Sequence, residues 1–157
     1  MYIVLDHLRS AHNTGNIFRL AEAVGAREIL ACGYTPVPPH PKLAKTAMGA
    51  DVLVPCRSFP DAVAAIAALR AEGVRQVVAV ETAPNAVDAW DYPYEFPLAL
   101  VFGNEALGLA QETIAACDGI VGLPMLGGKT SINVGNCAAV ALYAAVARLR
   151  RNPELAS

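Results

Sequence analysis

Apolar residues along this chain fall into short continuous runs separated by longer stretches with helical spacing. A short continuous apolar run predicts a strand covered on both faces, as in a parallel sheet. The runs predict strands at Tyr2–Leu5, Glu28–Cys32, Gln76–Val80, Leu98–Phe102 and Gly119–Leu123. We also expect an extended segment at Asp51–Pro55.

Three stretches predict helices. In Asn13–Val24 the apolar residues form one stripe, and Gly25 marks its end. The second predicted helix is Ser58–Glu72, with Ser58 as its N-cap, and the third is Val134–Arg150. Between the first and second predicted helices, the proline-rich segment Thr35–Pro41 is predicted to be irregular.

Strands that alternate with helices indicate an α/β fold with a mostly parallel sheet flanked by helices. The length of 157 residues fits a single domain, 1–157. The last helix is apolar on nearly every face from Cys137 to Ala147. Such a helix is buried on several sides, so we expect it to form a homodimer interface. The apolar stretch is too short to span a membrane.

Composition and charge narrow the function classes. Hydrophobic residues make up 55% and charged residues 17% of the chain, which excludes a disordered protein. The net charge of −2 excludes a polycation that coats nucleic acid. The N-terminus lacks the features of a signal peptide, so we expect a cytoplasmic protein. Neither the four scattered cysteines nor the three histidines have metal-ligand spacing, so we expect reduced thiols and no metal.

Three loops that follow predicted strands carry candidate chemistry, because ligands of α/β sheets bind beyond the carboxyl ends of strands. The first contains Asn13, a candidate helix cap, and Arg19, which is either a solvated surface residue or a functional one. The second, Gly103–Gly108, places Glu105 between two glycines. The third loop is glycine-rich and runs into the last helix. The exposed N–H groups at the start of that helix can hold polar ligand atoms.

The third loop is similar to a phosphate-binding loop but fails in register. The G-x-x-x-x-G-K-[ST] pattern that ends at Thr130 requires glycine at Leu123. No G-x-G-x-x-G is present either. A nucleotide-binding protein is therefore a disfavoured alternative. The modestly basic segment Lys42–Thr46 contacts either solvent or phosphate, and both interpretations stay open.

Taken together, the three loops resemble the SpoU branch of the SPOUT superfamily, the TrmH-like and TrmL-like RNA 2′-O-ribose methyltransferases. The matching segments are Asn13–Arg19, Phe102–Leu109, Leu123–Met125 and Ser131–Val134. The resemblance implies a homodimer with a C-terminal deep trefoil knot that binds S-adenosylmethionine. By position, it assigns cofactor binding to Val80, Gly103, Leu123, Ser131 and Ile132. It makes Arg19 the catalytic arginine, supported by Asn13, Glu105, Ser131 and Asn133.

The family's chemistry implies an RNA substrate. A sulfonium methyl group is already activated, so the protein has to align a ribose 2′-hydroxyl and stabilise the developing alkoxide. We expect tRNA as the substrate, with rRNA as the alternative, and no RNA-binding extension. A further alternative is a non-catalytic knotted protein that binds RNA or S-adenosylmethionine.

Overall fold

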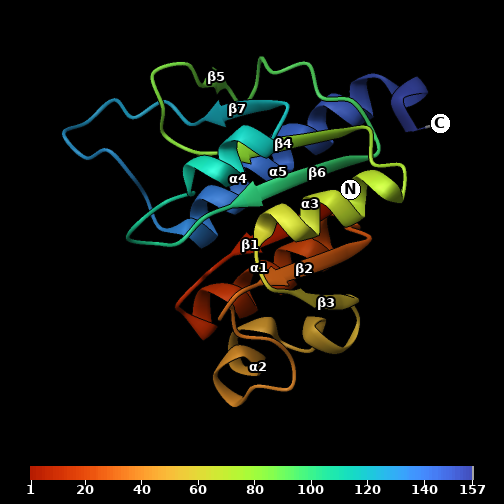
Figure 1. Ribbon diagram of the computed structural model, residues 1–157, viewed down its shortest axis with the longest axis vertical. Coiled ribbons are helices and arrows are strands. Elements are labelled where there is room, and N and C mark those ends of the chain that lie inside the picture. Colours follow the sequence, from red (N-terminus) through yellow and green to blue (C-terminus); the bar gives the residue numbers. More distant parts are fainter. Residues whose placement is uncertain (157) are drawn as a thin grey trace.

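The computed structural model describes residues 1–156, and its strands form one parallel sheet (Figure 1). The strand order is β3-β2-β1-β6-β4-β7-β5. The strands are β1 (Tyr2–Asp6), β2 (Glu28–Cys32), β3 (Cys56–Phe59), β4 (Gln76–Val80), β5 (Val87–Asp88), β6 (Leu98–Phe102) and β7 (Gly119–Gly122). All five strands predicted from apolar runs are present, and the predicted α/β class with a parallel sheet is confirmed.

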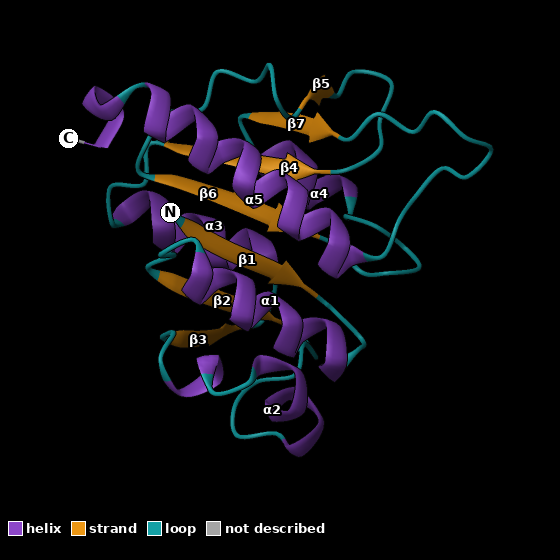
Figure 2. Ribbon diagram, turned by 180° about the vertical axis from the view of Figure 1, so that it is seen from behind, coloured by secondary structure: helices purple, strands orange, loops and turns teal. Residues whose placement is uncertain are grey.

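Helices cover both faces of this sheet. The helices are α1 (Ala11–Ala23), α2 (Pro41–Ala47), α3 (Ala62–Ala71), α4 (Gln111–Ala116) and α5 (Val134–Arg151). Helices α3 and α4 lie in front of the sheet in Figure 1, whereas α1 and α5 lie in front of it in the reverse view of Figure 2. Two separate apolar clusters, one on each side, show the same layering. The result is a three-layer sandwich.

Alternation along the strands divides the core between the two clusters. In β1, Ile3 and Leu5 pack with α1 and α5, and Val4 packs with α3. In β6, Leu100 packs on the first side and Val101 on the second. All five side chains are 0% exposed. These central strands are apolar at consecutive positions because each of their faces is covered by a helix layer.

The region between β2 and α3 differs from the prediction. The segment predicted as extended, Asp51–Pro55, instead begins in a 3-10 turn, Ala50–Val52, and the strand follows it at Cys56–Phe59. The predicted N-cap Ser58 lies inside this strand, because it pairs with Ala31 of β2. Helix α3 starts later, where the Asp61 side chain accepts a hydrogen bond from the Ala64 N–H at 2.8 Å.

The basic segment forms a helix that the proline pattern concealed. The His40 side chain caps α2, and Pro41 occupies its first turn. Proline is tolerated there because that position needs no backbone donor. Lys42 and Lys45 are exposed on this short helix. Within residues 1–156, no helix has the length and apolar character needed to cross a membrane.

Candidate active site

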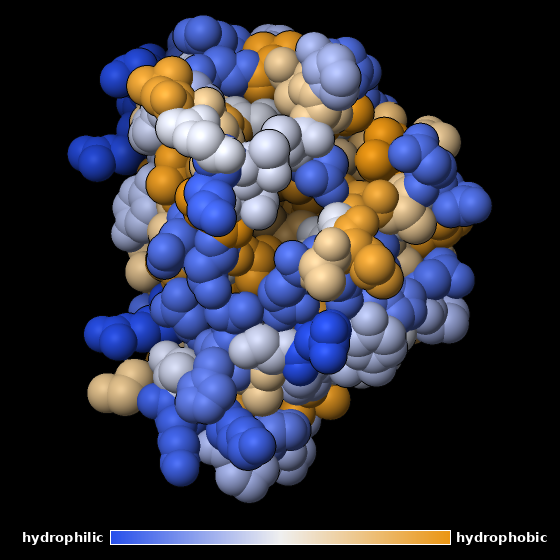
Figure 3. Space-filling model, turned by 90° about the vertical axis from the view of Figure 1, so that its left-hand side faces the viewer, coloured by the Kyte–Doolittle hydropathy of each residue, from blue (hydrophilic) through white to orange (hydrophobic). Residues whose placement is uncertain are grey.

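A cavity of about 680 Å³ lies at the carboxyl edge of the sheet. The loops that follow β4, β6 and β7 line it, together with Asn13 near the start of α1. Figure 3 faces this edge and shows a central hollow with hydrophobic residues inside, bordered by hydrophilic residues on the left and below and by hydrophobic residues on the right. The volume falls within the range of small-molecule sites. The cavity lies where parallel α/β sheets bind ligands.

Glu105 joins the loop after β6 to the start of α1. Its carboxylate accepts hydrogen bonds from the Arg9 N–H at 2.9 Å, the Ser10 N–H at 3.1 Å and the Asn13 side-chain amide at 3.2 Å. Burial alone would raise the pKa of the Glu105 carboxyl, but these hydrogen bonds outweigh it and hold the pKa below its usual value. Glu105 is therefore an ionised group that fixes the entry to α1.

The helix cap predicted at Asn13 is wrong. The Ser10 hydroxyl caps α1 by accepting from the Asn13 N–H at 3.1 Å, and the helix begins at Ala11. The Asn13 side chain is therefore available to contact other loops. Its Oδ1 accepts from the Asn133 side-chain amide at 3.1 Å. Asn133 in turn caps α5, since its Oδ1 accepts from the Gly135 and Asn136 N–H groups.

The loop after β6 folds back on itself at Gly103. A Cβ added to Gly103 would lie 2.6 Å from the Gly108 carbonyl carbon and 2.7 Å from the Leu109 nitrogen. Gly108 has φ +67°, a conformation that favours glycine. The two glycines thus allow the two ends of the loop to lie against each other. A side chain at Gly103 would separate them.

Two polar residues that the sequence analysis did not select hold this loop. The Asn104 Oδ1 accepts from the Ala106 and Leu107 N–H groups, each at 2.9 Å. The Glu81 carboxylate, at the end of β4, accepts from the Leu109 N–H at 2.9 Å. Asn104 stands within the quoted motif, directly after Gly103, which is a usable signal. Glu81 carries no sequence signal, because its partner is 28 positions away on a neighbouring loop.

All five residues assigned to the cofactor line the cavity: Val80, Gly103, Leu123, Ser131 and Ile132. The Val80 side chain is 7% exposed and forms an apolar wall, whereas Ile132 is 45% exposed at the mouth. The loop that carries Ser131 is attached to the end of β4, since the Thr82 hydroxyl donates to the Thr130 carbonyl at 3.1 Å. The structure thus brings this set together.

The lining of the cavity is acidic and contains no lysine or arginine among the described residues. Its ionisable side chains are Glu81, Glu105 and Cys137. Burial raises the pKa of the Cys137 thiol to about 11, so this group is neutral at neutral pH. Lys129 of the incomplete phosphate-loop pattern does not line the cavity. Two carboxylates without a cation disfavour a polyphosphate and suit a ligand with positive charge.

Arg19 lies apart from this cavity within one chain. It is exposed on α1, six residues beyond Asn13, which corresponds to about 9 Å along the helix axis. Its guanidinium makes no hydrogen bond or ion pair with the residues described in the structure. The structure therefore gathers Asn13, Glu105, Ser131 and Asn133 but does not bring Arg19 to them within the subunit.

Within residues 1–156, no group of three or more His, Cys, Asp or Glu side chains is arranged to hold a metal ion.

Known proteins resemble both the sequence and the fold. The sequence profile of the SpoU rRNA Methylase family matches residues 1–143. A tRNA (guanosine(18)-2′-O)-methyltransferase of Thermus thermophilus is 34% identical over 143 residues, which cover 91% of this chain and 72% of the relative. Against several other curated relatives, the chain spans only 51% to 64% of their length.

Two solved structures share the fold over nearly the whole chain. The SpoU methyltransferase AviRb from Streptomyces viridochromogenes, in complex with the cofactor AdoMet, has a TM-score of 0.85 at 29% identity and covers 97% of this chain and 58% of that one. A structure concerned with 2-OH methylation of C/U34 on tRNA has a TM-score of 0.84 at 25% identity, covering 96% and 97%. The resemblance in the three loops is confirmed, and this chain belongs to the SpoU rRNA Methylase family.

Proposed function

We propose that this protein transfers a methyl group from S-adenosylmethionine to a ribose 2′-hydroxyl of RNA. The observation that carries the proposal is the hydrogen-bonded series Glu105–Asn13–Asn133, which joins the three motif loops at one cavity. Relatives named as tRNA and 23S rRNA 2′-O-methyltransferases support the same activity. An ATP-binding function lacks comparable support, because the cavity is acidic.

The cavity fits the proposed cofactor. S-adenosylmethionine supplies an electrophilic methyl group on a positively charged sulfur. The carboxylates of Glu81 and Glu105 favour a cation in the cavity, and the apolar side chains of Val80, Leu123 and Ile132 suit an adenine ring. Gly103 allows the backbone to approach a ligand closely. We assign these residues and Ser131 to cofactor binding.

The chain's own polar groups align the acceptor hydroxyl. Ser131 lines the cavity at the start of the segment that leads into α5, next to the Asn133 cap. We propose that Ser131 and Asn133 orient the ribose and that Asn13 holds Asn133 in place. Glu105 positions Asn13 and does not act as a base, since three N–H donors already occupy its carboxylate.

Arg19 acts, in this proposal, at the active site of a second subunit. A guanidinium can stabilise a developing alkoxide and can form hydrogen bonds to a neighbouring phosphate. Arg19 is exposed on α1, and α1 lies beside α5 on the same face of the sheet (Figure 2). Helix α5 exposes Tyr143 at 46%, beside the half-buried Val140 and Ala147. We propose that these apolar residues pair two copies about a two-fold axis.

The remaining family properties are proposed on the basis of membership. We propose that the segment from Leu123 into α5 forms the trefoil knot implied by the family. We propose tRNA as the substrate, because the C/U34 structure covers this chain at nearly equal length. Ribosomal RNA is the alternative, supported by relatives that act on 23S rRNA. We also propose a cytoplasmic location, in keeping with either RNA substrate.

Two measurements test this function. Calorimetry should show binding of S-adenosylmethionine and none of ATP, and the opposite result would refute the proposal. Incubation with labelled S-adenosylmethionine and bulk tRNA or rRNA should label the RNA at a ribose. Cofactor binding without any transfer to either RNA would instead support a non-catalytic sensor.

A further inference from the structure

Tyr34 is an exposed aromatic residue next to the candidate active site, and the proposed chemistry does not use it. It follows β2 at the carboxyl edge of the sheet and is 57% exposed. Its hydroxyl accepts a hydrogen bond from the Asn104 side-chain amide at 3.0 Å. Asn104 belongs to the loop that lines the cavity. Tyr34 therefore lies beside the cavity.

The Tyr34 ring is held on a second side by His7. The two ring centroids are 4.9 Å apart and the ring planes are inclined at 73°, an edge-to-face contact. A Cβ added to Gly33, the residue before Tyr34, would collide with the His7 ring. Gly33 also has φ +61°. The backbone before Tyr34 is therefore shaped to admit the His7 ring.

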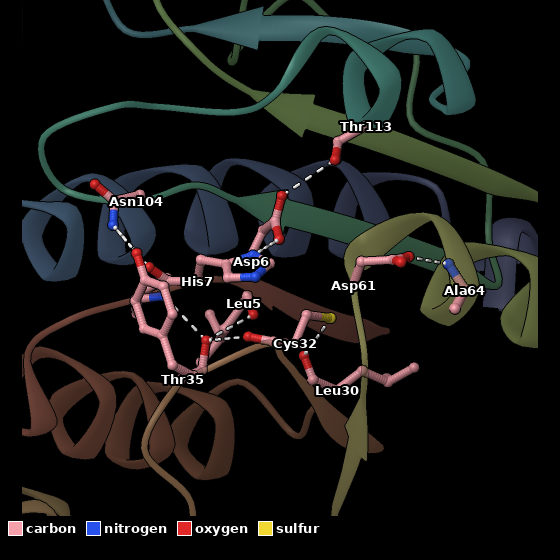
Figure 4. A network of polar contacts seen from close by, with 12 residues as sticks. Leu5, Asp6, His7, Leu30, Cys32, Thr35, Asp61, Ala64, Asn104 and Thr113 are labelled. Atoms are coloured by element: carbon pink, nitrogen blue, oxygen red, sulfur yellow. Dashed lines mark hydrogen bonds and ion pairs between the residues drawn. The ribbon is translucent and has the colours of Figure 1, made fainter.

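The His7 side chain is itself held in place by a hydrogen bond to a buried carboxylate. Its Nδ1 hydrogen-bonds to the Asp6 carboxylate at 2.7 Å, and Asp6 is 6% exposed. The second Asp6 oxygen accepts from the Thr113 hydroxyl of α4 at 3.1 Å (Figure 4). His7 has φ +55°, a conformation rarely adopted by non-glycine residues. Figure 4 shows Thr113, Asp6 and His7 in a line that points from α4 toward the loop after β2.

This arrangement orders a ring and leaves it open to solvent. Anchoring the hydroxyl to Asn104 does not require an exposed ring. A ring that is already fixed loses little entropy when a partner stacks on it, so affinity is gained at small cost. Single-stranded RNA is recognised largely by stacking of splayed bases on aromatic side chains. A protein with a net charge of −2 gains little from phosphate contacts, which makes stacking more important.

We propose that Tyr34 is a substrate-positioning residue that stacks on a base of the RNA next to the target ribose. The proposal rests on the proposed function for the identity of the substrate. The Thr113–Asp6–His7 series presents the ring, and Asn104 couples its position to the loop that lines the cavity. Base stacking does not depend on sequence, so Tyr34 holds the strand while the cavity receives the target nucleotide.

A comparison of RNA strands with and without bases tests the proposal without reference to the natural substrate. The probes are a ten-nucleotide single-stranded oligoadenylate and an abasic strand of equal length, each measured at low salt. Wild type should bind oligoadenylate more tightly than the abasic strand. Tyr34→Ala should weaken oligoadenylate binding about tenfold and leave abasic binding unchanged. Tyr34→Phe, which keeps the ring, should bind like wild type.

Trp90→Ala is the matched control, because Trp90 is a similarly exposed aromatic residue, at 56%, that does not line the cavity. It should behave like wild type. In methyl transfer to bulk tRNA, Tyr34→Ala should raise KM more than it lowers kcat. Equal loss in the Phe and Ala variants would show that the residue acts only through its hydroxyl on Asn104, and would overturn the proposal. The proposal would also be overturned if Tyr34→Ala changed the number of subunits in the assembly but left RNA binding unchanged.

Failure of this inference is separable from failure of the proposed function. Binding of S-adenosylmethionine by wild type and by each variant is measured by calorimetry, and melting temperatures establish that each variant is folded. If wild type does not bind S-adenosylmethionine and does not transfer methyl groups to RNA, the proposed function fails. The oligonucleotide result then stands by itself. If transfer occurs and Tyr34→Ala matches wild type in both assays, only the stacking role is refuted.

Discussion

The Glu105 carboxylate accepts a hydrogen bond from the side-chain amide of Asn13, 92 positions earlier in the chain. The same carboxylate accepts from the N–H groups of Arg9 and Ser10, so it occupies the positive end of helix α1. One acidic side chain thereby connects the loop after β6 to the helix that bears both Asn13 and Arg19. Its charge therefore influences stability and the geometry of the site together.

Glu105→Gln should destabilise the protein at neutral pH. The glutamine amide keeps one acceptor oxygen but turns its NH2 group toward N–H donors. We therefore expect the free energy of unfolding to fall by about 1 kcal/mol at this partly exposed site. The folded pKa of Glu105 lies below its usual value of 4.5. The carboxylate therefore stabilises the fold above pH 4.5 and loses this contribution as the pH falls through the folded value.

Urea unfolding at a series of pH values measures the effect. The difference in unfolding free energy between wild type and Glu105→Gln should be full at neutral pH and vanish in strong acid. Glu22→Gln is the control, since Glu22 is an exposed carboxylate on α1 whose side chain has no partner in the described structure. A pH-independent difference for Glu105→Gln would show that its charge does not matter.

Gly103→Ala should disrupt the cavity, because the new methyl group would meet backbone atoms of Gly108 and Leu109 at 2.6 and 2.7 Å. Backbone atoms cannot move aside as a flexible side chain can. We expect a loss of about 2 kcal/mol in the free energy of unfolding and a fall of at least about tenfold in affinity for S-adenosylmethionine.

Gly127→Ala provides the matched control in the loop after β7. A Cβ there meets nothing within 4 Å, and Gly127 is not at positive φ. It should leave both the melting temperature and cofactor affinity unchanged. If the two alanine variants behaved alike in thermal melts and calorimetry, close packing at Gly103 would not be the reason for its glycine.

The fold could be predicted where burial leaves a clear pattern. Strands β4 and β6 are apolar at nearly every position because helices cover both their faces. Strand β3 was displaced in the prediction because it lies at the edge of the sheet and its residues are only partly buried. Helix α4, Gln111–Ala116, is too short for an apolar stripe to stand out.

The candidate site was predictable to the extent that motif residues lie at strand ends. Asn13, Glu105 and Asn133 meet because a parallel sheet gathers its carboxyl ends at one edge. The contact between Glu81 and the Leu109 N–H depends on the order of strands, which local sequence does not encode. The helix cap was misplaced from Ser10 to Asn13 because both residue types are favourable caps.

Arg19→Ala should abolish most methyl transfer and leave the fold intact. Removal of one aligned electrostatic group costs about a hundredfold or more in rate. Arg19 is exposed and its side chain makes no hydrogen bond or ion pair within residues 1–156, so the melting temperature of Arg19→Ala should match that of wild type. Arg150→Ala, at the exposed end of α5, is the control and should retain activity.

A mixing experiment tests whether Arg19 serves the other subunit. Arg19→Ala and Ser131→Ala should each be inactive alone. In a heterodimer, the Arg19→Ala subunit keeps its own Ser131 and receives Arg19 from its partner, which restores one of the two sites. Random co-assembly yields heterodimers as half of all dimers, so about a quarter of wild-type activity should return. No recovery, with heterodimers verified, would place Arg19 in its own subunit's site or outside the reaction.

Tyr143→Glu should convert the proposed homodimer to monomers that remain folded. Tyr143 is 46% exposed on α5 of the single chain, so a carboxylate there has access to water and does not disturb the core. Between two copies the same charge would be buried without a partner, which costs several kcal/mol. Light scattering should give half the wild-type mass, with an unchanged circular dichroism spectrum. Val63→Glu, at an apolar position 41% exposed on α3 of the opposite face, should remain dimeric. A wild-type monomer, or a dimer that tolerates Tyr143→Glu, would exclude this face as the interface.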